Sequence, residues 1–288
     1  MSPISLIYFA IAALGFGGAF SLTNIAVAHF SPLDVAAARA GIAALATGGY
    51  VIWVGVRVPL TRKHLAVYLL LGVLTGAVPF AAIALGQRYI TSSLASVVFA
   101  SIPLFTLLAG PLVLAGQGLK GRKVAGAVTG LVGVAVAVSG GKVFPDQSFL
   151  IGGGLTLGAA ICYALGGLYV RRFEAIDPRA LSVGQLVAAA AMLSVLTVSD
   201  GGIPVRIENP SIFMTLVLLG VFGTAAPMVA IYLLIKETSP STASLVTFFV
   251  PFVAVAIGAL FLAEPLTPTL VIGFVLVLGG ASIVVRTT

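Results

Sequence analysis

LGVLTGAVPFAAIALG at residues 71–86 recurs as LGVFGTAAPMVAIYLL at residues 219–234. A shift of 148 positions places Leu71-Gly72-Val73 on Leu219-Gly220-Val221 and Pro79 on Pro227. Apolar segments can share leucine and alanine by composition alone, which is the alternative to duplication. An interior proline at the same place in both copies is harder to share by chance. An internal repeat is therefore the first organisation to consider.

The similarity continues beyond these segments. In the same register Ser93, Ala95-Ser96 and Pro103 fall on Ser241, Ala243-Ser244 and Pro251. After a slip of one residue, the glycines at 126 and 133 fall on those at 273 and 280. The stretch 219–285 is therefore predicted to be a second copy of 71–138. The predicted halves are residues 1–145 and 146–288.

The composition indicates which solvent surrounds the chain. Hydrophobic residues make up 60% of the 288 and charged residues only 8%, whereas soluble domains carry roughly 25% charged residues. Because such a chain cannot build a water-exposed surface, it is predicted to be an all-α protein embedded in the lipid bilayer. The lone Cys162 excludes an internal disulfide, and no metal-binding spacing of Cys and His is present. No cofactor or metal is expected.

Apolar runs of the length that crosses ~30 Å of hydrocarbon follow one another along the whole chain. They are separated only by short polar breaks, so no soluble domain is inserted. The runs predict ten transmembrane helices, at residues 3–28, 33–54, 65–86, 93–115, 122–140, 149–170, 179–198, 211–234, 241–262 and 267–286.

Lysine and arginine are spread unevenly over the loops, and this bias predicts orientation. With a cytoplasmic N-terminus, the outer loops hold only Arg88, Lys142 and Arg206. The inner loops and ends hold Arg57, Arg62, Lys63, Lys120, Arg122, Lys123, Arg171, Arg172, Arg179, Lys236 and Arg286. Topology thus accounts for the net charge of +7, and no nucleic-acid partner is expected. Both termini are predicted to be cytoplasmic.

Five helices in each half is an odd number, so the second half is predicted to run upside down relative to the first. The loops agree, because the one after helix four is basic and its counterpart after helix nine carries Glu264 and no Lys or Arg. Inverted repeats of this kind recur in secondary transporters, whose substrate sites lie near the midplane between the repeats. The predicted fold is two inverted five-helix repeats forming one membrane unit. Nothing in the sequence requires an oligomer.

Four prolines fall inside predicted spans, namely Pro79 and Pro103 in the first half and Pro227 and Pro251 in the second. Each lacks a backbone donor and presses its ring on the preceding turn. We interpret this symmetric set as kinks that shape a central cavity and act as bending points. Static kinks are the alternative, since membrane helices tolerate proline.

Polar and aromatic residues at membrane depth are the candidates for substrate binding. An unpaired amide in hydrocarbon is costly, so Asn24 is the leading polar candidate, whereas buried serines often only join helices. A pocket with aromatic walls and few polar groups suits an amphiphilic small molecule; packing against lipid or protein is the alternative for each aromatic. The predicted set is Phe16, Phe20, Asn24, Phe80, Ser96, Phe99, Tyr163, Ser244 and Phe248.

The ionisable residues limit the mechanism. No Asp or Glu falls in the middle of a predicted helix, so a carboxylate proton relay is not predicted; Glu264, at a helix end, is the nearest candidate. Arg39 is the one embedded charge, and such residues are functional candidates by default. It can pair with Asp34, reach the membrane surface, or meet a substrate carboxylate. No phosphate-binding loop or catalytic arrangement is visible, so neither ATP drive nor an enzyme is predicted.

Small residues predict where helices pack closely. Gly126–Gly130, Gly154–Gly158 and Gly273 with Gly279-Gly280 have the required spacing. We expect these contacts to let helices five and ten clamp against their neighbours as a scaffold.

The chain resembles the drug/metabolite transporter superfamily, and within it the EamA-type exporters and the bacterial aromatic-amino-acid exporters. The resemblance covers nearly the whole sequence and is most specific at Leu262-Ala263-Glu264-Pro265-Leu266-Thr267, followed by Gly273 and Gly279-Gly280. One departure is Gln117, where the first half would repeat the glutamate. The resemblance implies an exporter of the bacterial inner membrane with a pathway lined by both halves.

The sequence therefore favours a secondary transporter that exports small amphiphilic metabolites, above all aromatic and other neutral amino acids, by alternating access. A channel-like facilitator or uniporter, an exporter of a drug or another metabolite, and a structural membrane protein are the alternatives. Saturable flux with counterflow separates a carrier from a channel.

Overall fold

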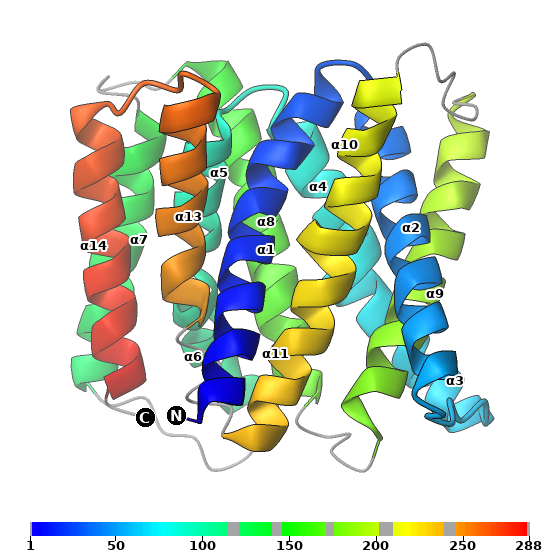
Figure 1. Cartoon of the computed structure of the whole chain (residues 1–288). Helices are drawn as coiled ribbons and strands as arrows, with labels where there is room; N and C mark the ends of the chain where they lie inside the picture. The colour runs from blue at the N-terminus through cyan, green and yellow to red at the C-terminus, as the bar shows by residue number, and fades with distance from the viewer. Residues whose placement is uncertain are drawn as a thin grey trace.

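The computed structural model describes residues 2–113, 121–139, 146–170, 176–201, 210–238 and 246–286. Within these ranges every regular element is helical, and the helices stand side by side (Figure 1). The first half contains α1 (Pro3–Val27), α2 (Pro32–Trp53), α3 (Arg62–Gly72), η1 (Val73–Ala77), α4 (Val78–Gly86), α5 (Ser92–Phe99), α6 (Ile102–Val113) and α7 (Gly121–Ser139). The second half contains α8 (Gln147–Val170), α9 (Pro178–Ser199), α10 (Pro210–Gly220), η2 (Val221–Ala225), α11 (Ala226–Glu237), α13 (Val246–Phe261) and α14 (Pro268–Arg286).

The predicted spans coincide with these helices where the chain is described. Residues 114–115 of the fourth span, 140 of the fifth and 241–245 of the ninth lie outside the described residues. Among the described residues, seven apolar stretches have the length and composition to cross a membrane: Pro3–Val27, Pro32–Trp53, Arg62–Gly86, Ser92–Gly110, Gln147–Val170, Pro178–Ser199 and Pro210–Leu234. Three shorter apolar helices are also described, at Val124–Ser139, Val246–Phe261 and Pro268–Ile283. The all-helical membrane architecture is thus confirmed, while the count of ten crossings stays a prediction.

Helix starts are fixed by short capping sequences. Ser2, Ser31 and Asp177 each stand directly before a proline at the first helical position, where its missing N–H costs nothing. Their side-chain oxygens accept from the backbone N–H groups of Ser5, Asp34 and Arg179, the usual role of an N-cap. Polar breaks of only a few residues therefore suffice to end one helix and begin the next.

Both copies of the repeated segment contain a π-helical turn at the matched position. η1 joins α3 to α4 and η2 joins α10 to α11, and Pro79 and Pro227 follow in the first turns of α4 and α11. Proline offers no N–H to the carbonyl four residues earlier, and a π turn rearranges the ladder at such a place. The two prolines consequently have equivalent surroundings.

The second proline pair has unequal surroundings. The chain leaves helical geometry at Ala100-Ser101, and Pro103 is the second residue of α6. The Ser101 hydroxyl donates to the carbonyl of Val98 at 2.6 Å. Pro251, in contrast, lies inside the continuous helix α13. The break in α5–α6 is therefore a feature of the first half that the repeat does not copy.

Helices α7 and α14 pack backbone to backbone through glycines (Figure 1). A Cβ at Gly126 would lie 2.8 Å from the carbonyl oxygen of Gly280, and one at Gly133 would lie 2.8 Å from that of Gly273. Each glycine thus touches the repeat partner of the other, so the two helices run antiparallel. The predicted helices five and ten are α7 and α14. They do form a close-packed scaffold contact, and they form it with each other.

The expectation for Gly154–Gly158 was wrong. A Cβ at Gly154, Gly158 or Gly279 would meet nothing within 4 Å. Other glycines of α8 make close contacts instead: Gly152 with Gly86 and Ile90, Gly153 with Val138, and Gly166 with Thr75. The glycines in α8 share a helix but not a face, and spacing alone does not say which face meets a neighbour.

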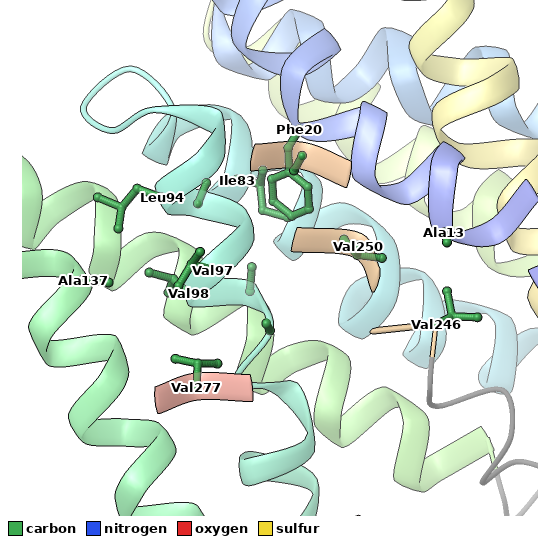
Figure 2. Close-up of a cluster of buried hydrophobic side chains, with 14 of the residues drawn as sticks. Ala13, Phe20, Ile83, Leu94, Val97, Val98, Ala137, Val246, Val250 and Val277 are labelled. Atoms are coloured by element: carbon green, nitrogen blue, oxygen red, sulfur yellow. The ribbon is translucent and has the colours of Figure 1, made fainter. Parts of the chain in front are cut away.

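Contacts between the halves come in pairs that the repeat exchanges. Helix α1 packs on α11 as α8 packs on α4, and α2 packs on α10 as α9 packs on α3. One buried cluster joins the halves, with Phe20 and Ile83 from α1 and α4 and Val250 and Val277 from α13 and α14 (Figure 2). The core therefore lies between the two halves rather than within each.

Candidate functional site

A cavity of about 630 Å³ lies between the two halves, within the range of small-molecule sites. Helices α1, α2, α4, α8, α9, α11 and α13, the turn η1 and the α5–α6 break contribute to its wall. The lining residues are Phe16, Ala19, Phe20, Arg39, Thr75, Ile83, Phe99, Ala100, Ile102, Tyr163, Gly167, Val170, Ile176, Pro178, Leu181, Met228, Ile231, Tyr232, Val246, Thr247 and Val250. The wall is mostly apolar with few polar groups.

The cavity reaches one end of the bundle. The first residues of α1 and the last of α14 lie together at this end, which we call the terminal end, and the opposite one the far end (Figure 1). The end of α8 and the start of α9, at Val170 and Pro178, belong to the lining and lie at the terminal end (Figure 1). The α4–α5 and α13–α14 connections at the far end contribute no described lining residue. In this conformation the cavity therefore extends from the terminal end to the middle of the bundle.

An aromatic row forms one wall. The rings of Phe20 and Phe99 meet edge to face at 5.4 Å between centroids, and those of Phe99 and Tyr163 at 5.0 Å. Edge-to-face contacts of this kind are favourable. Because the three rings come from α1, α5 and α8, the row joins both halves along the cavity.

Arg39 supplies the charge in the middle of the bundle. It is only 6% exposed, its Nε donates to Thr224 Oγ1 at 2.9 Å, and its guanidinium lies 4.1 Å from the centre of the Phe80 ring. The Thr224 hydroxyl in turn donates at 2.9 Å to the carbonyl of Leu219, near the end of α10. Of the three alternatives for Arg39, pairing with Asp34 and reaching the surface do not describe this buried position.

Gln185 occupies the equivalent position in the second half. Aligning Ser31-Pro32 with Asp177-Pro178, the starts of α2 and α9, places Arg39 on Gln185. Gln185 contacts the hydroxyl of Thr75 at 2.9 Å and the sulfur of Met228 at 3.0 Å, and Met228 is the repeat partner of Phe80. Thr75 also donates to the carbonyl of Leu71 at 2.7 Å.

Each half therefore reaches across to the π turn of the other. In each arrangement a threonine of the π turn also donates to a leucine carbonyl, of Leu71 or Leu219, although the two threonines differ by one position in the register of 148. The arrangements differ in charge, because arginine in the first half is replaced by neutral glutamine in the second. Gln185 also donates to the Tyr232 hydroxyl at 3.1 Å. The site is built with twofold symmetry but carries one positive charge.

Thr224→Val is expected to destabilise the protein more than Thr75→Val does. Both changes remove a hydroxyl that donates to the carbonyl of a leucine just before the π turn, Leu219 or Leu71, at a cost of about 1–3 kcal/mol for an unsatisfied buried group. Thr224→Val also removes the hydrogen-bond acceptor of a buried cation. Thermal unfolding of the purified variants in detergent measures the difference, and equal losses would contradict it.

Glu264 joins the halves at the far end. Its Oε1 accepts from the Ser92 N–H at 2.8 Å and the Ser92 hydroxyl at 2.7 Å, and its Oε2 accepts from the Ser93 N–H at 2.9 Å and from the Ser93 hydroxyl. These donors form the first turn of α5, where a negative charge is stabilising. Gly258 of α13 leaves room for this arrangement, because a Cβ there would collide with Glu264 and Ser93. We call this contact the far-end clasp.

The structure brings together part of the predicted substrate-binding set. The cavity is lined by Phe16, Phe20, Phe99 and Tyr163. The ring of Phe80 packs against the guanidinium of Arg39. The remaining described members are not in the lining: Asn24 is half-buried on α1, Ser96 is buried with its hydroxyl on the Ser93 carbonyl, and Phe248 packs with Leu104, Leu107 and Leu131. Ser244 and Gln117 lie outside the described residues.

Three residues of the central arrangement were absent from the predicted set, namely Thr75, Gln185 and Thr224. The shift of 148 positions that aligns the π turns does not align α2 with α9, which requires 146. An alignment anchored on the two capping sequences would have paired Arg39 with Gln185.

The family of the chain follows from a comparison of its sequence with known families. The model of the EamA-like transporter family matches twice, over residues 3–139 and 150–286. The chain belongs to the EamA-like transporter family. The two matches correspond to the two copies seen in the repeated segment and in the paired π turns. This EamA-like protein is a multi-pass membrane protein.

Relatives of this EamA-like protein are described as transporters. An uncharacterized transporter of Archaeoglobus fulgidus is 28% identical over 94% of both chains. The uncharacterized transporter YyaM of Bacillus subtilis is 29% identical over 92% of this chain and 88% of its own. The uncharacterized inner membrane transporter YedA of Escherichia coli is 28% identical over 84% of this chain and 78% of its own. The substrate is not part of these descriptions.

The fold is shared with a crystal structure of another protein. That chain superposes with a TM-score of 0.71, covering 98% of this chain and 95% of the other at 19% identity. Similarity at this level of identity shows a common fold. In the described part of this chain no group of three or more His, Cys, Asp or Glu is placed to hold a metal.

Proposed function

We propose that this EamA-like protein is a secondary transporter that exports neutral amino acids, including aromatic ones, across the bacterial inner membrane by alternating access. The pathway is the cavity between two five-helix halves, divided near residues 145 and 146 and inverted relative to each other in ten crossings. The terminal end faces the cytoplasm, as the distribution of lysine and arginine favours.

The observation that supports this proposal most is a cavity reached from one end and clasped at the other. The lining runs from the terminal end to Arg39, and Glu264 holds the first turn of α5 at the far end. A transporter open to one side has this arrangement, and an inverted repeat can exchange its two sides. The contacts of α1 with α11 and of α8 with α4 are equivalent under the repeat. The same helices can therefore pack in an equivalent way when the cavity opens to the other side.

Transport in liposomes tests the proposal. The purified protein is expected to move labelled phenylalanine, threonine or methionine with saturable kinetics and counterflow. Counterflow distinguishes a carrier from a channel, and a drug or unrelated metabolite moved in place of these amino acids would assign a different substrate class. The absence of flux for every amino acid in the panel would rule out the proposed substrates.

Pro79→Ala is expected to slow this flux. Alanine restores an N–H that a regular helix can use, so the π turn at η1 loses its cause. A shift of ~1.4 kcal/mol in the balance between the two open forms changes that balance tenfold, and we expect a rate lower by about that factor. Pro3→Ala, at the exposed start of α1, is the matched control and should leave the rate unchanged.

A further inference from the structure

A buried cation, Arg39, in the wall of the cavity is the starting observation. Arg39 makes no ion pair with the residues that the structure describes; the pair found there joins Arg179 to Asp177 at 2.9 Å. A guanidinium stays protonated in proteins, so Arg39 brings its charge into the bundle. Taking an unpaired charge out of water is costly, and Thr224 and the face of Phe80 are neutral partners.

The geometry of Arg39 defines the shape of its missing partner. The Nε of Arg39 donates to Thr224, and the two terminal nitrogens of its guanidinium make no hydrogen bond to the described chain. These two nitrogens form one edge of the guanidinium fork, which matches two oxygens of one carboxylate. A ligand in the cavity can bring such a group to Arg39, since Arg39 belongs to the lining.

The symmetry of the site limits the charge of the ligand. The position equivalent to Arg39 is neutral Gln185, already bonded to Thr75 and Tyr232. Among the described lining residues Arg39 is therefore the one cation, which suits one monoanionic group. The described lining contains no Asp or Glu, so it offers no carboxylate to a ligand ammonium.

We propose that Arg39 is the carboxylate-binding residue of the cavity, and that its ligands are monocarboxylates with an aromatic or bulky apolar body. The body lies along the row of Phe20, Phe99 and Tyr163, and an amino group on the ligand adds little affinity. This inference rests on the proposed function in that the cavity is the transport site, and it deepens that function by naming the recognised group.

Binding of three matched probes to the purified full-length protein tests the inference by calorimetry. The probes are 3-phenylpropanoate, phenylalanine and phenethylamine, which carry the carboxylate alone, both groups, and the amine alone. We expect the two carboxylates to bind with similar affinity, and phenethylamine to bind about tenfold to a hundredfold more weakly, as for the loss of a charge-assisted pair. Equal or tighter binding of phenethylamine, or no binding of either carboxylate, would overturn the inference.

Variants locate the effect at Arg39. Arg39→Gln copies the residue of the second half, keeps a donor for Thr224, and is expected to lower 3-phenylpropanoate affinity by the same factor. Arg39→Lys keeps the charge without the fork, and we expect an intermediate affinity. Arg57→Gln removes an exposed arginine before α3 and should bind like the parent protein. Unchanged affinity in Arg39→Gln would overturn the assignment; should it unfold, Arg39→Lys and the probe series still decide it.

Flux in liposomes separates this inference from the proposed function. Carboxylate binding that depends on Arg39 without transport of any probe would refute the transporter mechanism and leave the binding site intact. Transport of phenylalanine that is unaffected by Arg39→Gln would refute the binding site and leave the transporter mechanism intact.

Discussion

Gly280→Ala is expected to destabilise the α7–α14 scaffold by about 1–3 kcal/mol or more, the usual cost of overpacking. A Cβ at this position would collide with backbone atoms of Gly126 and Gly130. Backbone atoms cannot move away by rotating as a flexible side chain does. The α7 and α14 helices must therefore separate to make room for the methyl group. Separation also breaks the contact of Gly133 with Gly273, because both contacts belong to one interface.

Gly279→Ala is the matched control for this prediction. Gly279 is the preceding residue of the same helix, and a Cβ there would meet nothing within 4 Å. Alanine in a helix interior is favoured over glycine by ~1 kcal/mol, so this variant should be as stable as the parent or slightly more so. Thermal unfolding of both variants in detergent measures the contrast, and equal effects at 279 and 280 would contradict the backbone contact.

Gly133→Ala should repeat the loss seen at 280. Gly133 is the repeat partner of Gly280, and a Cβ there would lie 2.7 Å from the backbone nitrogen of Val277. Because the interface is related by the repeat, its two ends are expected to respond alike.

Helix positions were predictable from the sequence because the bilayer requires long apolar runs and the loops are short. The runs at 33–54 and 179–198 differ by a residue or so from α2 and α9. The capping pairs Ser31-Pro32 and Asp177-Pro178 mark these starts by local chemistry alone. Pro79 and Pro227 likewise marked the places where the regular ladder changes, although the π turns themselves were not predicted.

The rotation of each helix about its axis was not predictable in the same way. Helix α1 is apolar on every side, so no periodic pattern tells which face meets the cavity and which meets lipid. Phe16 and Phe20, selected for their aromatic character, line the cavity, whereas Asn24 on the same helix is absent from the lining. Phe248, also selected as an aromatic residue at membrane depth, packs against Leu104 instead.

Contacts between distant residues were the other missing information. Glu264 was noted at a helix end, but nothing in its neighbourhood along the chain names Ser92 and Ser93 as its partners. Arg39 was recognised as embedded, yet Thr224 becomes its partner only because η2 turns that hydroxyl towards α2. The sequence identified the residues with unusual chemistry, and the packing of the two halves decides what they meet.

Glu264→Gln is expected to open the far end of the pathway. The carboxylate accepts from two N–H groups and two hydroxyls in the first turn of α5. An amide retains one oxygen and presents an NH₂ group to the donors of the other serine, and it loses the attraction of its charge to the helix start. Charge-assisted hydrogen bonds contribute about 1.5–3 kcal/mol each. We therefore expect the closed form of the far end to lose ~3 kcal/mol of stability.

Thiol labelling at Ser21 measures this opening. Ser21 is 2% exposed on α1, its hydroxyl lies 3.5 Å from that of Ser92, and it follows the cavity residue Phe20 towards the far end. In a Cys162→Ala background, Ser21→Cys should react slowly with a membrane-impermeant maleimide added outside the cell. A loss of ~3 kcal/mol corresponds to a population change of about a hundredfold, and Glu264→Gln should accelerate labelling by a factor of that order.

Glu237→Gln provides the control for charge. Glu237 is exposed at the end of α11, on the terminal side of the bundle, so its neutralisation should leave the labelling rate of Ser21→Cys unchanged. Acceleration by both variants would indicate a general effect of charge on folding. An unchanged rate in Glu264→Gln would mean that the clasp does not hold the far end closed, and that packing of α5 against α13 closes it without the carboxylate.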